Sequence, residues 1–140
     1  MLPLASILLA FSVAQGEPIQ ATQVRAVARV VHAHTTDSTL ALAASVVGWR
    51  ESRFGRYGHR AFGCYGVAPT LDAQAACAVG TVGSGFRRCG AWDAALSYHH
   101  HGDRDCRVDG YGRAAARQLA WMLGHASIVG TPTVPAQVRP

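Results

Sequence analysis

The longest regular stretches of this chain repeat apolar residues at the spacing of an α-helix. Between Ala21 and about His32, valines recur every three or four residues, and the arginines of the stretch fall on the other side. Because an α-helix turns once every 3.6 residues, this spacing places the valines on one face. The pattern predicts an amphipathic helix whose buried face is formed by Val24, Val27, Val30 and Val31.

A second helix is predicted to begin after Thr36 or Asp37, because either side chain can accept a hydrogen bond from the first helical turn. This helix runs to about Glu51, and its middle is almost free of charge. A helix without a charged face has no side suited to solvent, so we expect it to pack on several sides. Its apolar positions include Leu40, Ala43, Ala44 and Val47.

The rest of the chain is predicted to form shorter helices separated by glycine-rich segments. Thr70 can cap a short helix, and the last helix carries Leu119, Trp121 and Met122. The segment 55–66 has no helical period and could include a short β-hairpin. We therefore expect one mainly α domain, with helices over 71–77, 91–100 and 111–125 and irregular segments over 55–66, 80–90 and 102–110.

Residues 1–14 are almost entirely apolar. This run is too short to cross a bilayer as a helix, for which about 20 residues are needed. It resembles the hydrophobic region of a secretory signal, and small residues near Ala14 and Gly16 suit cleavage, although the segment contains no arginine or lysine. We predict a leader over 1–16, a folded domain over 17–129 and a flexible tail over 130–140. The alternatives are an uncleaved membrane-tethering leader and a buried first helix.

The charge of the chain points to an anionic partner. The sequence has 140 residues, 49% of them hydrophobic and 15% charged, which is typical of a globular protein and not of a disordered one. Its net charge of +5 comes from arginine alone, since no lysine occurs. The arginines are dispersed along the chain, so they favour cell-wall polymer at least as much as nucleic acid or anionic lipid.

An even number of cysteines in a small exported domain indicates disulfides. Four cysteines allow three pairings, and we favour the sequential one, which closes two short loops worth about 3 kcal/mol each. A zinc site is the alternative, but no two of these cysteines have the Cys-x-x-Cys spacing. The residues concerned are Cys64, Cys77, Cys89 and Cys106.

Glu51 is the residue most suited to acid catalysis. The only other glutamate, Glu17, lies beside the predicted cleavage site. Burial and the negative end of a helix both disfavour an ionised carboxyl group, so we expect Glu51 to hold a proton near neutral pH. The alternative is an exposed glutamate that pairs with a neighbouring arginine, Arg50, Arg53 or Arg56.

Three motifs in order along the chain resemble those of the lytic transglycosylase branch of the lysozyme superfamily. They are Glu51-Ser52-x-Phe54, then Gly63-Cys64-Tyr65-Gly66-Val67, then Ala95-Leu96-Ser97-Tyr98. A fourth similarity is Gly110-Tyr111 at the start of the last helix. The spacing between Glu51 and Gly63 is also like that of the family, and the resemblance covers about residues 40–121. It implies a lysozyme-like domain that cleaves the β-1,4 bonds of peptidoglycan.

The resemblance also implies roles for individual residues. Glu51 would be the catalytic acid and then the base, in a reaction that ends in a 1,6-anhydro sugar. The residues that would contact the sugar or steady the catalytic loop are Ser52, Gly63, Tyr65, Gly66, Tyr98, His99 and Tyr111. Tyr98 in particular is expected to bring its hydroxyl near Glu51 or an N-acetyl group.

The chain departs from the family pattern at two sites of the groove. Pro69 stands where the family has a glutamine near the sugar, and His99 stands where asparagine is usual. These departures motivate a second hypothesis, a component that binds peptidoglycan without cutting it. A hydrolytic mechanism also stays open, because several aspartates lie in segments that could bring a second carboxylate near the loop. The candidate second carboxylates are Asp72, Asp93, Asp103, Asp105 and Asp109.

We expect neither a metal nor another cofactor. Consecutive residues on a helix point about 100° apart, so His99, His100 and His101 cannot all face one ion. The expected partner of the monomeric, exported protein is the peptidoglycan glycan strand, in the periplasm or outside the cell. Assembly partners in a cell envelope, phage or secretion machine are also compatible. A basic module for anionic lipid or nucleic acid is the remaining alternative.

Overall fold

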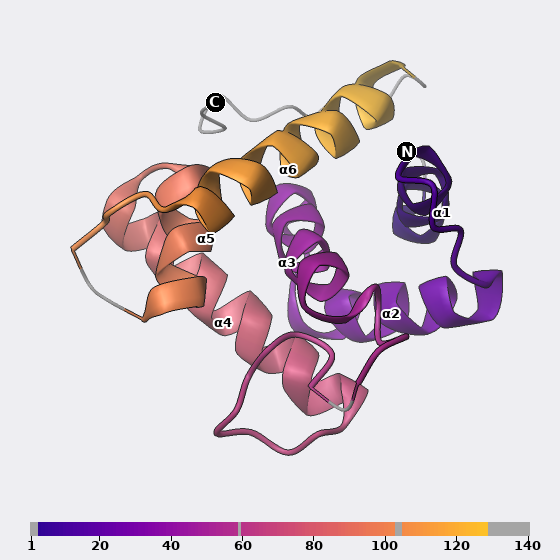
Figure 1. Cartoon of the computed structure of the whole chain (residues 1–140), viewed down its shortest axis with the longest axis horizontal. Coiled ribbons are helices and arrows are strands. Elements are labelled where there is room, and N and C mark those ends of the chain that lie inside the picture. Colours follow the sequence, from indigo (N-terminus) through magenta and orange to yellow (C-terminus); the bar gives the residue numbers. More distant parts are fainter. Residues whose placement is uncertain (1–2, 59, 103–104, 129–140) are drawn as a thin grey trace.

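The computed structural model describes residues 3–58, 60–102 and 105–128, and these fold into helices joined by irregular segments (Figure 1). The helices are α1 (Leu4–Ala14), α2 (Ala21–His34), α3 (Ser38–Ser52), α4 (Leu71–Cys89), α5 (Trp92–His101) and α6 (Gly110–Ile128). The mainly α fold expected from the sequence is confirmed. Within the described residues there is no strand, so a β-hairpin is not found in 55–66.

α3 is the central helix of the fold and contacts each of the other helices (Figure 1). Asp37 caps it by accepting a hydrogen bond from the Leu40 N–H at 3.0 Å, as the sequence indicated. From Ala41 to Trp49 every residue is buried. The absence of charge in this stretch is thus explained by packing on all sides.

The predicted leader segment contains α1, which packs against α2, α3 and α6. Leu4, Ile7 and Leu8 are buried, and the ring of Phe11 meets Trp49 edge to face at a centroid distance of 5.3 Å. In this structure α1 is therefore part of the hydrophobic core. Removal of the leader stays a prediction, and the tail over 130–140 lies outside the described residues.

α4 is much longer than the sequence analysis expected. The helix predicted to end near Cys77 continues to Cys89, and Gly90 ends it in a left-handed conformation with φ of +73°. The expected loop over 80–90 is thus wrong. Gly83 and Gly85 are buried within α4, where the missing side chains let neighbouring helices approach.

The sequential disulfide pairing is confirmed. Cys64–Cys77 joins the segment after α3 to α4, and Cys89–Cys106 joins the end of α4 to the segment between α5 and α6. Each bond therefore fixes an irregular segment to the same long helix.

Candidate active site

Glu51 lies in the last turn of α3, where the backbone reverses. Arg53 and Phe54 adopt positive φ angles of 54° and 58°. Their N–H groups donate to Trp49 and Gly48 carbonyls of the helix. The chain that follows can thus fold back across the end of α3 and toward Glu51.

The side chain of Glu51 is exposed, and it lines a groove of about 460 Å³. It is the only carboxylate that lines this groove within the described part of the chain. The position differs from the buried one expected for an acid catalyst, because the groove is open to water. The other lining residues are Arg50, Gly63, Tyr65, His99, His100 and Tyr111.

Gly63 lies directly against Glu51. Its φ is +72°, which only glycine adopts without strain. A Cβ atom built at this position would lie 2.7 Å from Glu51 Cδ and would overlap the carboxylate. Both the positive φ and the contact with Glu51 therefore require glycine at position 63. The absence of a side chain lets the loop backbone lie next to the acid.

Ser52 fastens both ends of the loop to α3. Its buried hydroxyl can donate to the Ala61 carbonyl, at 2.8 Å, and it accepts from the Gly55 N–H at 2.6 Å. One hydroxyl thus ties the loop where it leaves the helix and where it returns. Ser52 does not line the groove, so its contribution is to hold the loop.

Gln74 is a site residue that the sequence analysis missed. Its buried Oε1 accepts from the N–H groups of Phe62 and Cys64, and its Nε2 donates to the carbonyls of Cys64 and Ala68. Together with the Cys64–Cys77 bond, this amide fixes the loop around Gly63. A signal was present, because Gln74 is a polar residue among alanines and lies one helical turn before Cys77.

His99 connects three parts of the site. Its Nε2 donates to the Phe62 carbonyl at 3.1 Å, so its Nδ1 accepts from the Thr81 hydroxyl of α4. Burial lowers the pKa of His99, although the hydrogen bond to Phe62 and the charge of Glu51 partly oppose that effect. His99 is thus a neutral ring that holds the loop to α4 and α5, and both of its nitrogens are occupied.

Tyr111 is the tyrosine that lies beside Glu51. The His100 ring stacks on it at 4.3 Å between centroids, and the Arg50 guanidinium lies 4.8 Å from its centroid. Burial raises the pKa of its hydroxyl, and the nearby charge of Glu51 raises it further. The buried hydroxyl makes no hydrogen bond of good geometry among the described residues, but the Glu51 side chain is close enough to raise the pKa of Tyr111 as a hydrogen-bond acceptor as well.

The structure does not bring Tyr98 into the groove. A Cβ atom at Gly85 would lie 3.2 Å from Tyr98 Cβ, so this side chain starts toward α4. Tyr65 does line the groove, at its exposed rim, whereas Gly66 is exposed with open space around it. Of the two tyrosines on the last two helices, Tyr111 takes the position expected for Tyr98.

The aspartates mostly serve helix ends and surface pairs. Asp72 pairs with His34 at 2.9 Å, and Asp93 and Asp105 accept hydrogen bonds from nearby backbone N–H groups. Asp103 lies outside the described residues. Asp109 accepts from the Gly112 N–H at the start of α6 and pairs with His100. None of the described aspartates lines the groove.

Asp109 remains ionised down to acidic pH. Its partial burial alone would raise its pKa, but hydrogen bonds with His100, Gly112 and Ser97 together lower the pKa to about 2. The Asp109 carboxylate binds His100 at 2.9 Å and so holds that ring against Tyr111. Asp109 therefore supports the wall of the groove from behind.

The three consecutive histidines have three different partners. His99 binds Phe62 and Thr81, His100 binds Asp109, and the Nε2 of His101 binds the Arg107 carbonyl at 3.1 Å. Each ring thus points in its own direction, as the helical geometry requires.

No model of a known protein family, no curated protein and no solved structure matches this chain. The two disulfides are compatible with a secreted protein. None of the described helices combines the length and the apolar character needed to cross a membrane.

Proposed function

We propose that this protein cleaves the glycan strand of peptidoglycan as a lytic transglycosylase with a lysozyme-like domain. The observation that carries the proposal is the contact between Glu51 and Gly63, two residues of separate motifs that come together in one groove. A single carboxylate among the described residues that line the groove supports a reaction that needs only one acid–base residue. The net charge of +5 suits an acidic polymer.

The proposed reaction uses Glu51 twice. Its carboxyl group gives its proton to the glycosidic oxygen as the bond from that oxygen to the anomeric carbon breaks. The resulting carboxylate then takes the proton of the C6 hydroxyl while O6 bonds to the anomeric carbon. The product is a 1,6-anhydro sugar, Glu51 regains its proton, and no water is consumed.

The groove residues would assist at defined points. A sugar that fills the groove displaces water from the side chain of Glu51 and brings the glycosidic oxygen beside it. The Tyr111 hydroxyl keeps its proton and can donate to the carboxylate formed midway. The Gly63 backbone leaves space for the sugar directly beside the acid.

A hydrolytic mechanism has less support. Inverting glycosidases place a second carboxylate about 6.5–9.5 Å from the acid, and retaining ones about 5–5.5 Å. Glu51 has no carboxylate companion in the lining formed by the described residues. The described residues thus offer no second acidic group in the groove to activate a water molecule.

The test uses the full chain with isolated peptidoglycan sacculi and mass spectrometry of the soluble products. We expect products with anhydro ends, and loss of the products in Glu51→Gln. Glu17→Gln is the matched control, because Glu17 lies away from the groove and pairs with Arg53. Reducing ends would indicate a hydrolase. Binding without products from the wild-type chain would mean a peptidoglycan-binding protein, and an active Glu51→Gln variant would exclude Glu51 as catalyst.

A further inference from the structure

The segment 53–70, here called the arginine–tyrosine loop, exposes aromatic rings that the proposed reaction does not use. Tyr57 is 64% exposed and Tyr65 is 78% exposed, which makes them the most exposed large hydrophobic side chains of the described residues. Only Tyr65 reaches the groove of Glu51. Exposed rings of this size on one short loop are typical of a surface that binds another molecule.

Each of these tyrosines is paired with an arginine of the same loop. The Arg56 guanidinium lies 5.4 Å from the centroid of Tyr57, and that of Arg60 lies 5.0 Å from the centroid of Tyr65. A guanidinium at this distance from a ring is a cation–π contact. The loop thus presents the same pair twice, a flat apolar ring beside a fixed positive charge.

The loop is held in place, although its described residues, 53–58 and 60–70, form no regular secondary structure. Ser52 ties its first half to α3 at Gly55 and Ala61, Gln74 makes four hydrogen bonds with the backbone of its second half, and Cys64–Cys77 links it to α4. A ligand that binds a surface of fixed shape loses less entropy than one that must order it. The two pairs are therefore presented in a defined geometry.

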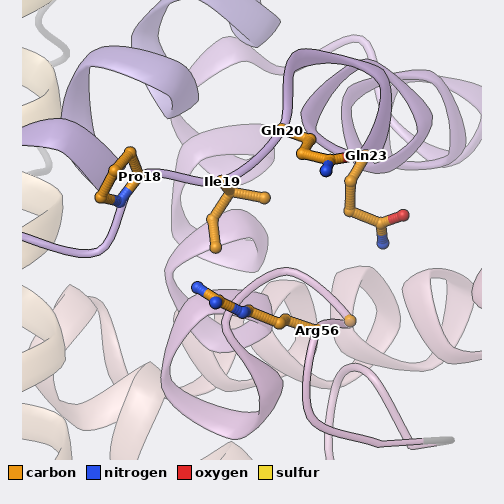
Figure 2. A pocket seen from close by; sticks show the side chains of 6 residues that line it. Pro18, Ile19, Gln20, Gln23 and Arg56 are labelled. Carbon is orange, nitrogen blue, oxygen red and sulfur yellow. The ribbon is translucent and has the colours of Figure 1, made fainter.

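The charge of the loop has one sign. Segment 53–70 contains three arginines and no acidic residue. Arg53 is paired with Glu17 at 3.3 Å, whereas Arg56 lines a second cavity of about 400 Å³ beside the start of α2. Figure 2 shows the Arg56 side chain reaching across this cavity toward Ile19. Pro18, Gln20, Gln23 and Gly55 complete the lining.

We propose that the arginine–tyrosine loop is a binding surface for a polysaccharide strand that carries carboxylates, separate from the bond-cleaving groove but continuous with it through Tyr65. The apolar face of a sugar ring packs on an exposed tyrosine, and the neighbouring guanidinium binds the carboxylate of the sugar's substituent. The strand would extend from the groove over Arg60 and Tyr57 to the cavity at Arg56. The identity of the polysaccharide as peptidoglycan glycan rests on the proposed function.

Binding can be measured apart from cleavage by working in the Glu51→Gln background. The probe is a set of soluble glycan strands freed of their peptides, whose lactyl carboxylates are exposed, and neutral chitin oligosaccharides serve as the comparison. We expect tighter binding of the acidic strand. Arg56→Ala with Arg60→Ala should weaken it about tenfold, because two surface charge contacts are removed. Tyr57→Ala should weaken the binding of both the acidic strand and the neutral oligosaccharides.

The matched control is Arg25→Ala with Arg29→Ala, which removes the same charge from the exposed face of α2. Equal weakening by both pairs of substitutions would mean a general charge effect and would overturn the proposal. Unchanged binding in the loop variants would also overturn the proposal. The same holds if the loop binds single-stranded DNA more tightly than the acidic glycan strand at the same salt concentration. If the wild-type chain releases no products but the loop variants lose binding, the proposed function fails and the binding surface stands.

Discussion

Two segments of this chain have the same number of glycines and contain a cysteine, yet one is a loop and the other is a helix. Segments 55–66 and 80–90 each have four glycines. In the first, Gly55 and Gly63 have positive φ angles and the chain doubles back over α3. In the second, Gly80, Gly83 and Gly85 continue α4. Glycine content alone therefore does not distinguish a turn from a close helix contact.

The residues between the glycines make the difference. Ala75, Ala78, Val79 and Val82 recur at helical spacing and are buried, so the helix is held by its own backbone bonds and an apolar face. Segment 55–66 has no such period, and its backbone bonds are completed by the side chains of Ser52 and Gln74. The loop near Glu51 thus depends on a few polar side chains.

The largest expected effect on stability comes from substituting Gln74, which holds the loop. Gln74→Ala removes the amide that accepts from the buried N–H groups of Phe62 and Cys64 and donates to the Cys64 carbonyl. We therefore expect a loss of about 3–4 kcal/mol in the free energy of unfolding. Urea denaturation at neutral pH measures it. The exposed Gln20→Ala is the control, and it should change stability by less than about 0.5 kcal/mol. A loss for Gln74→Ala as small as that of the control would mean that the loop is held by other contacts.

Gly63 should be the most sensitive of the loop glycines. Gly63→Ala places a side chain at a φ of +72° and against Glu51, so we expect a loss of about 2 kcal/mol in stability. The contact with Glu51 is isolated by repeating the substitution in Glu51→Ala. There the cost should fall by about 1 kcal/mol, because the overlapping carboxylate is gone. An equal cost in both backgrounds would show that Gly63 and Glu51 are not in contact.

Gly85 should be the most sensitive of the helix glycines. A Cβ atom there would lie 3.1 Å from the Cα atom of Ala95 on α5, and a helix backbone cannot easily withdraw. We expect Gly85→Ala to lower stability by about 1–2 kcal/mol despite its better helix propensity. Gly83→Ala is the control, because it meets only the side-chain ends of Leu40 and Arg87, which can move. Thermal unfolding of both variants measures the difference, and a greater loss for Gly83→Ala would contradict the packing of α4 on α5.

The sequence was sufficient for elements that rest on local signals. Spacing and capping predicted the bounds of α2 and α3 closely and offered Asp37 as one of two candidate caps, and they favoured the sequential disulfide pairing among three. The structure agrees with each. The length of α4 was not predicted, because its glycines were interpreted as turn residues, whereas Gly83 and Gly85 serve contacts with α3 and α5 inside the helix.

The site itself was predictable only in part. The motifs assigned Glu51 and Gly63 to one site, and the two residues do lie together. That Tyr111 lies beside Glu51 in place of Tyr98 depends on how α5 and α6 are rotated against α4, which is set by packing between helices distant in sequence. The neutral state of His99 depends likewise on burial that only the folded chain provides.

The attachment of the loop to α4 should depend on pH, because His99 joins the two. Its pKa is lowered by burial from the usual 6.5, so the unfolded chain takes up a proton at a higher pH than the folded one. The contribution of His99 to the free energy of unfolding is therefore complete above about pH 6.5. It is lost as the pH falls below that value, at up to about 1.4 kcal/mol per pH unit. Urea denaturation between pH 7 and pH 5 should show a steeper loss for the wild type than for His99→Asn. Parallel curves would mean that His99 is not buried.

The smallest expected effect is at Gly80, and it separates the two kinds of glycine-rich segment most directly. Gly80 lies in the middle of α4, is exposed, and has open space where a Cβ atom would be. Within a helix, alanine is favoured over glycine by about 0.5–1 kcal/mol, so Gly80→Ala should raise stability by about that amount. Gly55→Ala is the matched loop substitution, and it should destabilise because Gly55 has a φ of +87°. Opposite signs in the two unfolding curves are expected. If Gly80→Ala also destabilised the protein, segment 80–90 would be the loop that its glycines first indicated.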